Sequence, residues 1–159
     1  MRVNGVGPRP CEWMIVGEGP GWLEDKCGLP FVGPTGDELD RLLAANRLPS
    51  RTRLFLTNIY REYQGHDYTY TADDLARDEP ALQKELQQVR PSTIITLGRH
   101  ATRYFLGDVS MEGVWGLPWT LPAGAPYPHP PDGVVILPVH HPAAGLHNSD
   151  MSPYVVAGF

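Results

Sequence analysis

The chain has 159 residues, of which 42% are hydrophobic and 19% charged, a composition typical of one folded domain and not of a disordered segment. Its formal net charge of −5 gives no long-range attraction to nucleic acid, so DNA binding would need a local basic face. The longest apolar runs, such as 134–139, are too short to span a bilayer, and the first residues lack the apolar core of a signal peptide. Two cysteines form no disulfide framework and have no metal-ligand spacing, which indicates a cytoplasmic protein.

Four short apolar runs predict the strands of one sheet, at 13–16, 54–58, 93–97 and 134–139. Helical patterns separate them. A leucine stripe follows a capping box at 35–38, and a longer helix runs from a cap at Thr71 to Arg90 with a reset at Pro80. A short helix over 99–106 ends at Gly107, 108–133 stays unassigned, and a last helix opens at 152–153. This alternation predicts a single-domain three-layer α/β/α fold over 1–159, with a central, mainly parallel four-stranded sheet.

The carboxyl ends of these strands are expected on one edge of the sheet, because right-handed crossovers bring each strand back in the same direction. Ligands of open α/β sheets bind at that edge. Four loops are predicted to meet there: 17–33, 58–70, 98–100 and 140–148. These loops are therefore expected to carry the functional residues.

Loop 17–33 reads GEGPGWLEDKCGLPFVG and places Glu18 among glycines that let the backbone approach a ligand closely. The loop matches neither GxGxxG nor GxxxxGK[ST], so it is not a nucleotide-binding fingerprint; the alternative is a plain strand-to-loop turn. Asn58 ends the second strand, where its amide either caps its own loop or offers a donor and an acceptor to one planar partner. Phe31 is either a core residue or, from its place at the edge, a stacking surface.

Loop 140–148 contains three histidines but no HxH or HxxxH pattern and no accompanying acid, so we expect no metal. One histidine there is expected to donate a hydrogen bond to a ligand, with capping of the strand end as the alternative. His66 and His100 are assigned no role. Five arginines form either a basic rim or scattered surface charge: Arg51, Arg53, Arg61, Arg99 and Arg103.

Taken together, these loops resemble the motifs of the uracil-DNA glycosylase superfamily, nearest its family-4 and family-5 branches. GEGPG and GLPFVG in 17–33 are similar to the first motif, and Thr57-Asn58 to the second-strand motif. VRPSTIITLG at 89–98 is similar to the third strand, and HPAA at 141–144 to the closing motif. The resemblance runs from about residue 13 to about residue 150, with the motifs in the family's order.

The resemblance implies a role for individual residues. Glu18 would activate the hydrolytic water or stabilise the cationic sugar, and His141 would donate to the base O2 as the glycosidic bond breaks. Phe31 would stack on the extruded base, Asn58 would bind its Watson–Crick edge, and Leu146 would enter the vacated stack. The implied base-binding residues are Gly17, Gly19, Gly21, Phe31 and Asn58, and those that press on the DNA are Pro20, Pro142, Ala143, Leu146 and His147.

The cysteines depart from the family-4 pattern. Family-4 members carry an iron–sulfur cluster on four cysteines, whereas no Cys-x-x-Cys precedes the first strand here, and Glu62 and Asp78 stand near two of the cysteine positions. We therefore expect no cluster and no other cofactor, and expect packing by tyrosines to hold residues 60–74. Gly21 leaves no side chain beside the C5 edge of a base, so room for a C5-substituted pyrimidine is expected. Relatives also continue a terminal helix beyond the position of Phe159.

The resemblance implies a monofunctional DNA glycosylase that flips out uracil or a related modified pyrimidine and hydrolyses its N-glycosidic bond. Water is the expected nucleophile, because the only lysines, Lys26 and Lys84, do not lie opposite Glu18. The expected partner is DNA, single- or double-stranded, and the protein is expected to act as a monomer away from membranes. Two alternatives stay open: a glycosylase for bulky C5-modified phage bases in antiphage defence, and a catalytically idle relative that binds DNA or abasic sites.

Overall fold

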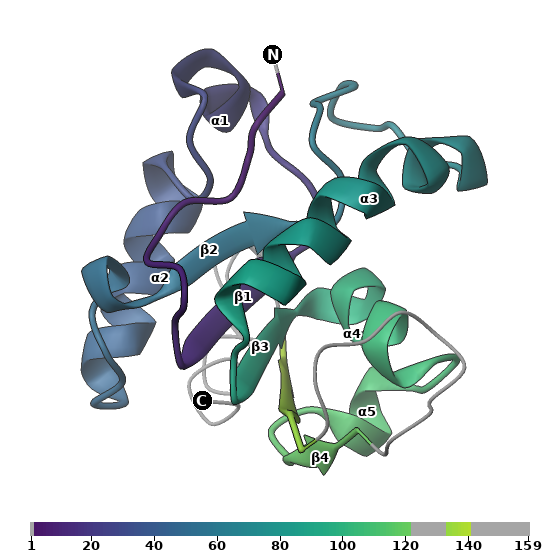
Figure 1. Ribbon diagram of the computed structural model, residues 1–159. Helices are drawn as coiled ribbons and strands as arrows, with labels where there is room; N and C mark the ends of the chain where they lie inside the picture. Colours follow the sequence, from purple (N-terminus) through teal and green to yellow (C-terminus); the bar gives the residue numbers. More distant parts are fainter. Residues whose placement is uncertain (1, 122–132, 141–159) are drawn as a thin grey trace.

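The computed structural model describes residues 2–121 and 133–140, which build one sheet in the order β2-β1-β3-β5-β4 (Figure 1). Strands β1 (Trp13–Gly17), β2 (Phe55–Asn58), β3 (Thr93–Leu97) and β5 (Val135–Val139) pair in parallel, which confirms the predicted α/β class. The predicted number of four strands is too small. A fifth strand, β4 (Trp119–Thr120), pairs antiparallel with β5, and its two residues are too short to show an alternating pattern in the sequence.

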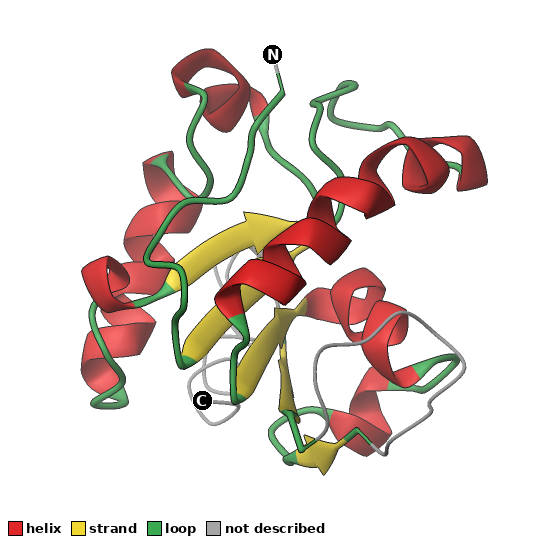
Figure 2. Ribbon diagram, viewed as in Figure 1, coloured by secondary structure: helices red, strands yellow, loops and turns green. Residues whose placement is uncertain are grey.

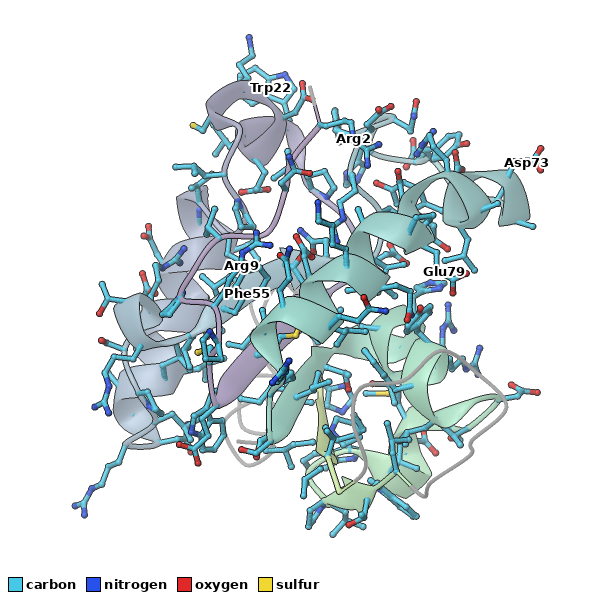
Figure 3. All side chains as sticks on the ribbon, in the orientation of Figure 1. Arg2, Arg9, Trp22, Phe55, Asp73 and Glu79 are labelled. Carbon is cyan, nitrogen blue, oxygen red and sulfur yellow. The ribbon has the colours of Figure 1, made fainter. Side chains whose placement is uncertain are left out.

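The helices alternate with the strands, as predicted (Figure 2). Thr71 caps the long helix as expected, since its Oγ1 accepts from the amide of Asp74 at 3.2 Å. The predicted reset at Pro80 is wrong, because one continuous helix runs through Pro80. The helix after loop 17–33 begins earlier than its capping-box pattern predicts, with Val32 at the N-cap and Pro34 in the first turn, where the fixed φ of proline suits a helix start. Glu38 pairs with Arg41 one turn further along. The helical elements are α1 (Trp22–Cys27), α2 (Gly33–Ala45), a 3-10 turn (Arg51–Arg53), α3 (Ala72–Val89), α4 (Gly98–Leu106) and α5 (Met111–Val114).

The helices cover both faces of the sheet. Leu82 and Leu86 of α3 and Phe105 of α4 pack with Met14 and Ile94 on one face. On the other face, Leu39 and Leu43 of α2 pack with Ile15, Leu56 and Ile95. The central strands are therefore buried on both sides, as their continuous apolar runs require. Figure 1 shows α3 lying across the sheet, so the predicted three layers are present.

The segment before β1 runs beside β2, the edge strand opposite β4. Val6 forms an isolated antiparallel bridge with Leu56, and the amide of Val3 donates to the carbonyl of Arg61 at 2.7 Å. This segment satisfies backbone groups that an uncovered edge strand would expose. In the described part of the chain, no helix is long and apolar enough to cross a membrane. The helix expected at 152–153 lies outside the described residues.

Candidate active site

A cavity of about 210 Å³ lies at the carboxyl ends of β1 and β2, where the sequence predicts that the loops meet. Gly17 and Asn58 are paired in register at these strand ends. The amide of Tyr60 donates to the carbonyl of Glu18 at 2.8 Å, so the first residues of the two loops are held together. Six of the sequence-predicted site residues share the cavity wall with Thr35, Tyr63, Tyr68 and Tyr70: Glu18, Gly19, Pro20, Gly21, Phe31 and Asn58.

Gly17, Phe31 and Asn58 meet on one side of this cavity. A Cβ added to Gly17 would lie 2.5 Å from Asn58 Oδ1 and 2.9 Å from the Phe31 ring, so only glycine leaves these two side chains in place. Asn58 is 2% exposed, and its Oδ1 has no hydrogen-bond partner among the described residues. Because buried polar atoms in folded proteins normally have partners, this acceptor at the cavity points to a ligand donor.

The backbone at Phe31 is strained. Its φ of 53° lies in the left-handed region that non-glycine residues rarely adopt, and such residues cluster at functional sites. Arg51 holds the segment from the opposite side, donating from Nη2 to the carbonyl of Gly36 at 3.2 Å and from Nε to Asp40 at 2.9 Å. A Cβ on Gly36 would lie 2.1 Å from the carbonyl oxygen of Phe31, so α2 approaches this loop closely enough to require glycine.

Glu24 organises the loop between β1 and α2. One of its carboxylate oxygens accepts from the amide of Gly21 at 2.9 Å, and the other from the amide of Val32 at 3.1 Å. A Cβ on Gly21 would lie 2.7 Å from Glu24 Oε1, so a carboxylate takes the space that the sequence leaves empty beside Gly21. Glu24 was not among the predicted site residues, although its place in a capping position three residues after Gly21 is a recognisable signal in the sequence.

Tyrosines form the opposite wall, which agrees with the expectation that they hold residues 60–74. Tyr60 and Tyr70 stack with ring centroids 4.0 Å apart, and Tyr68 meets Tyr70 edge-on. The hydroxyl of Tyr70 donates to the carbonyl of Glu62 at 2.9 Å, and a Cβ on Gly19 would lie 2.5 Å from that hydroxyl. Burial and then the charge of Glu18 raise the pKa of Tyr70, so this wall is neutral at physiological pH.

Glu18 has a partner that the sequence analysis did not identify. Oε2 of its carboxylate lies 2.9 Å from Nε2 of His100, which stands in the first turn of α4. Both side chains are partly exposed, at 37% for Glu18 and 51% for His100. The sequence did indicate that the two residues lie near each other, because loops 17–33 and 98–100 were predicted to meet at the same edge of the sheet. It did not single out His100, because His100 belongs to no motif.

Arg61 does not belong to the basic rim that was one of the two interpretations of the five arginines. Arg61 is fully buried and donates to Glu85 through both terminal nitrogens, at 2.8 and 2.5 Å. The same carboxylate accepts from Thr57 at 2.7 Å and from the amide of Gly5 at 3.0 Å. This pair therefore ties the N-terminal segment to β2 beside Asn58, and it is structural.

The described residues do not fit an iron–sulfur cluster of the kind that family-4 members carry on four cysteines. Cys11 is buried and its Sγ donates to backbone carbonyls at 3.2 Å, while Cys27 is exposed on α1. Within 2–121 and 133–140, no three histidine, cysteine or acidic side chains gather as metal ligands. A cluster needs thiolates, and Glu62 and Asp78 pair with arginines instead: Arg2 lies 2.9 Å from Asp78 and 3.6 Å from Glu62, and Arg77 lies 2.8 Å from Asp78.

The closing loop lies outside the described residues, and with it His141, Pro142, Ala143, Leu146 and His147. The structure reaches His140, directly after β5, whose ring packs against Trp115 at 5.2 Å. Burial lowers the pKa of His140, which keeps it neutral near physiological pH. The loop that follows thus starts from the same sheet edge as Glu18 and Asn58.

A parallel sheet with a small polar cavity at its carboxyl edge defines an α/β enzyme of the class in which crossover loops build the active site. The family model described as uracil DNA glycosylase superfamily matches residues 5–156. The type-4 uracil-DNA glycosylases of Sulfurisphaera tokodaii and Saccharolobus solfataricus are 30% and 33% identical over 149 and 148 residues, which cover 94% and 92% of this chain and 67% of each relative. That of Thermotoga maritima is 30% identical over 150 residues, which cover 92% of this chain and 72% of the relative. The chain belongs to the uracil-DNA glycosylase superfamily and is a DNA glycosylase, a hydrolase of N-glycosyl bonds.

Proposed function

We propose that the chain excises uracil, or a closely related pyrimidine, from DNA and leaves an abasic site. The observation that carries this proposal is the buried, unpartnered Oδ1 of Asn58 at the cavity. Uracil presents an N3–H donor beside the O4 acceptor, and a side-chain amide is complementary to that pair of groups. The N3–H of thymine or uracil satisfies Oδ1, whereas neutral cytosine in the same position presents its N3 acceptor to Oδ1 and leaves it unpaired at a cost of about 1–3 kcal/mol.

The remaining residues of the cavity have consistent roles in this reaction. A base must leave the duplex stack before an enzyme can reach its glycosidic bond, at a cost of a few kcal/mol, and Phe31 offers it a new stacking surface. As the bond breaks, positive charge grows on the sugar and negative charge on the base. Glu18 stabilises the sugar cation and directs water to C1′, and His141 donates to O2 of the leaving base.

DNA contact in this proposal comes from rigid loops and not from a basic surface. Pro20 lines the cavity, and in this proposal it presses on the backbone of the target strand together with Pro142, Ala143 and His147. Leu146 fills the space that the base leaves. Main-chain amides of a glycine-rich loop can approach phosphates that long side chains would block, which reconciles DNA binding with a net charge of −5.

Water is the nucleophile in the proposed mechanism. A lyase-type reaction needs an amine at C1′, but the ammonium of Lys26 lies over the ring of Trp22, 4.7 Å from its centroid, on α1. Lys84 lies within α3. Neither lysine lines the cavity, so the reaction ends at the abasic site.

The size of the cavity favours an unsubstituted pyrimidine over a bulky C5-modified base. Its volume of about 210 Å³ lies below the roughly 300–1,000 Å³ of sites for larger ligands, and Glu24 occupies the space beside Gly21. The alternative in which the chain only binds DNA gives no account of Glu18, because a carboxylate repels phosphate and assists only the cleavage step.

The experiment is a base-release assay on single- and double-stranded oligonucleotides that carry uracil, thymine or a glucosylated hydroxymethylcytosine. We expect free uracil and a stoichiometric abasic site. Glu18→Ala and His141→Ala should each lower the single-turnover rate by roughly 10²–10³-fold, while Glu112→Ala on the exposed side of α5 should leave it unchanged. Retained DNA binding without release of any base would contradict the proposal, and release only of the modified cytosine would establish the bulky-base alternative.

A further inference from the structure

We propose that His100 is a positioning residue for Glu18, a role that rests on the proposed function above. The observation is the 2.9 Å contact between Nε2 of His100 and Oε2 of Glu18. His100 does not line the cavity, whereas Glu18 does. His100 therefore acts on the reaction through Glu18 and not by touching the base or the sugar.

The two side chains come from neighbouring strand ends. Glu18 directly follows β1, and α4 starts at Gly98, directly after β3, which pairs in parallel with β1. The φ of 86° at Gly98 lets the chain turn from strand into helix without a connecting loop. His100 thus stands on a helix whose inner face, including Ala101 and Phe105, is buried, so its backbone is a fixed support for the carboxylate.

His100 is the one ion-pair partner of Glu18 among the described residues. The other titratable groups that face Glu18 are Tyr60 and Tyr70, whose pKa values are raised first by burial and then by the charge of Glu18. Within the described part of the chain, this carboxylate beside two neutral phenols has no other cation to fix its rotamer. Contact with His100 occupies Oε2 and leaves Oε1 for the cavity, where water and the sugar are expected.

This arrangement has a kinetic consequence. A carboxylate that is already oriented needs no reorganisation when charge develops on the sugar, whereas a displacement of about 1 Å can cost on the order of 10²-fold in rate. Base binding depends on Phe31 and Asn58, on the other side of the cavity. Loss of His100 is therefore expected to lower the rate of bond cleavage and to leave DNA affinity unchanged.

The test is single-turnover uracil release from pH 5 to pH 9 by wild type, His100→Ala and His100→Gln, with abasic-site DNA affinity measured for each. We expect His100→Ala to lose roughly 10–100-fold in rate at unchanged affinity, and His100→Gln to recover most of it, because glutamine retains an N–H donor at similar reach. The pH profile of the rate should differ between wild type and His100→Gln, because a glutamine side chain does not ionise.

A Glu18→Gln background provides the matched control. If His100 acts through Glu18, adding His100→Ala to Glu18→Gln should cost little more, whereas an independent role would give additive losses. Additive losses, or a His100→Ala rate and pH profile equal to wild type, would overturn the positioning role. A wild-type protein that releases no base would instead overturn the proposed function itself. Since both side chains are partly exposed, the variants are expected to fold, and melting temperatures will verify this.

Discussion

We predict that Glu85, through its buried ion pair with Arg61, contributes more to stability than any other single residue near the active site. Glu85 is 4% exposed, and its carboxylate accepts four hydrogen bonds, two from Arg61 and one each from Thr57 and Gly5. Glu85→Gln keeps the shape but leaves the Arg61 guanidinium charged in the interior without a counter-ion. Breaking a buried pair in this way costs about 3–5 kcal/mol, which is roughly 6–20 °C in Tm for a domain of this size.

The assay is thermal unfolding followed by circular dichroism, with urea unfolding for the free energy. The control is Glu38→Gln, which removes a partly exposed i,i+3 pair with Arg41 and should cost less than about 1 kcal/mol. Replacing both partners, as Arg61→Met with Glu85→Leu, should recover much of the loss, because no unpaired charge remains. An unfolding free energy of Glu85→Gln within about 1 kcal/mol of the wild-type value would refute the predicted cost of the unpaired buried charge.

Two further predictions concern the loop at Phe31 and the acid side of the stability profile. Gly36→Ala should lower both Tm and uracil release, because its Cβ would lie 2.1 Å from the carbonyl oxygen of Phe31; Gly113→Ala, whose Cβ meets nothing within 4 Å, should change neither. For Asp78, burial opposes ionisation, but hydrogen bonds from Arg77, the Arg61 amide and Arg2 prevail and lower its pKa. Above about pH 4, the ordinary pKa of an aspartate, the unfolding free energy of wild type should therefore exceed that of Asp78→Asn. This difference should disappear as the pH falls through the lowered pKa of Asp78. Urea unfolding at pH 3–7 measures this, and a difference that is constant with pH would contradict it.

The parallel sheet was predictable from the sequence because its strands are continuous apolar runs between clear helix signals. Thr71 identified the start of α3 through a local contact that sequence spacing encodes. By contrast, β4 has two residues and is fixed only by pairing with β5. The early start of α2 escaped prediction because its N-cap, Val32, has no capping side chain, whereas the capping-box pattern at 35–38 lies inside the helix.

For the candidate site, the sequence predicted which loops meet but not which side chains touch. Glu18, Phe31 and Asn58 line one cavity, as the convergence of strand ends requires. His100 was missed because it lies 82 positions from Glu18 and belongs to no motif, so only the fold brings it near. Arg61 was misread as a rim candidate because a buried arginine needs a partner, Glu85, that the sequence does not mark.

The most direct test of the account is a crystal structure with an oligonucleotide that carries 2′-fluoro-2′-deoxyuridine. The electronegative fluorine opposes positive charge on the sugar, so the base should stay attached while it occupies the cavity. We predict an extruded uracil stacked on Phe31, with its N3 within about 3.2 Å of Asn58 Oδ1 and its C1′ facing Glu18. A uracil that remains in the DNA stack, or one bound with Asn58 Oδ1 still unpartnered, would contradict it.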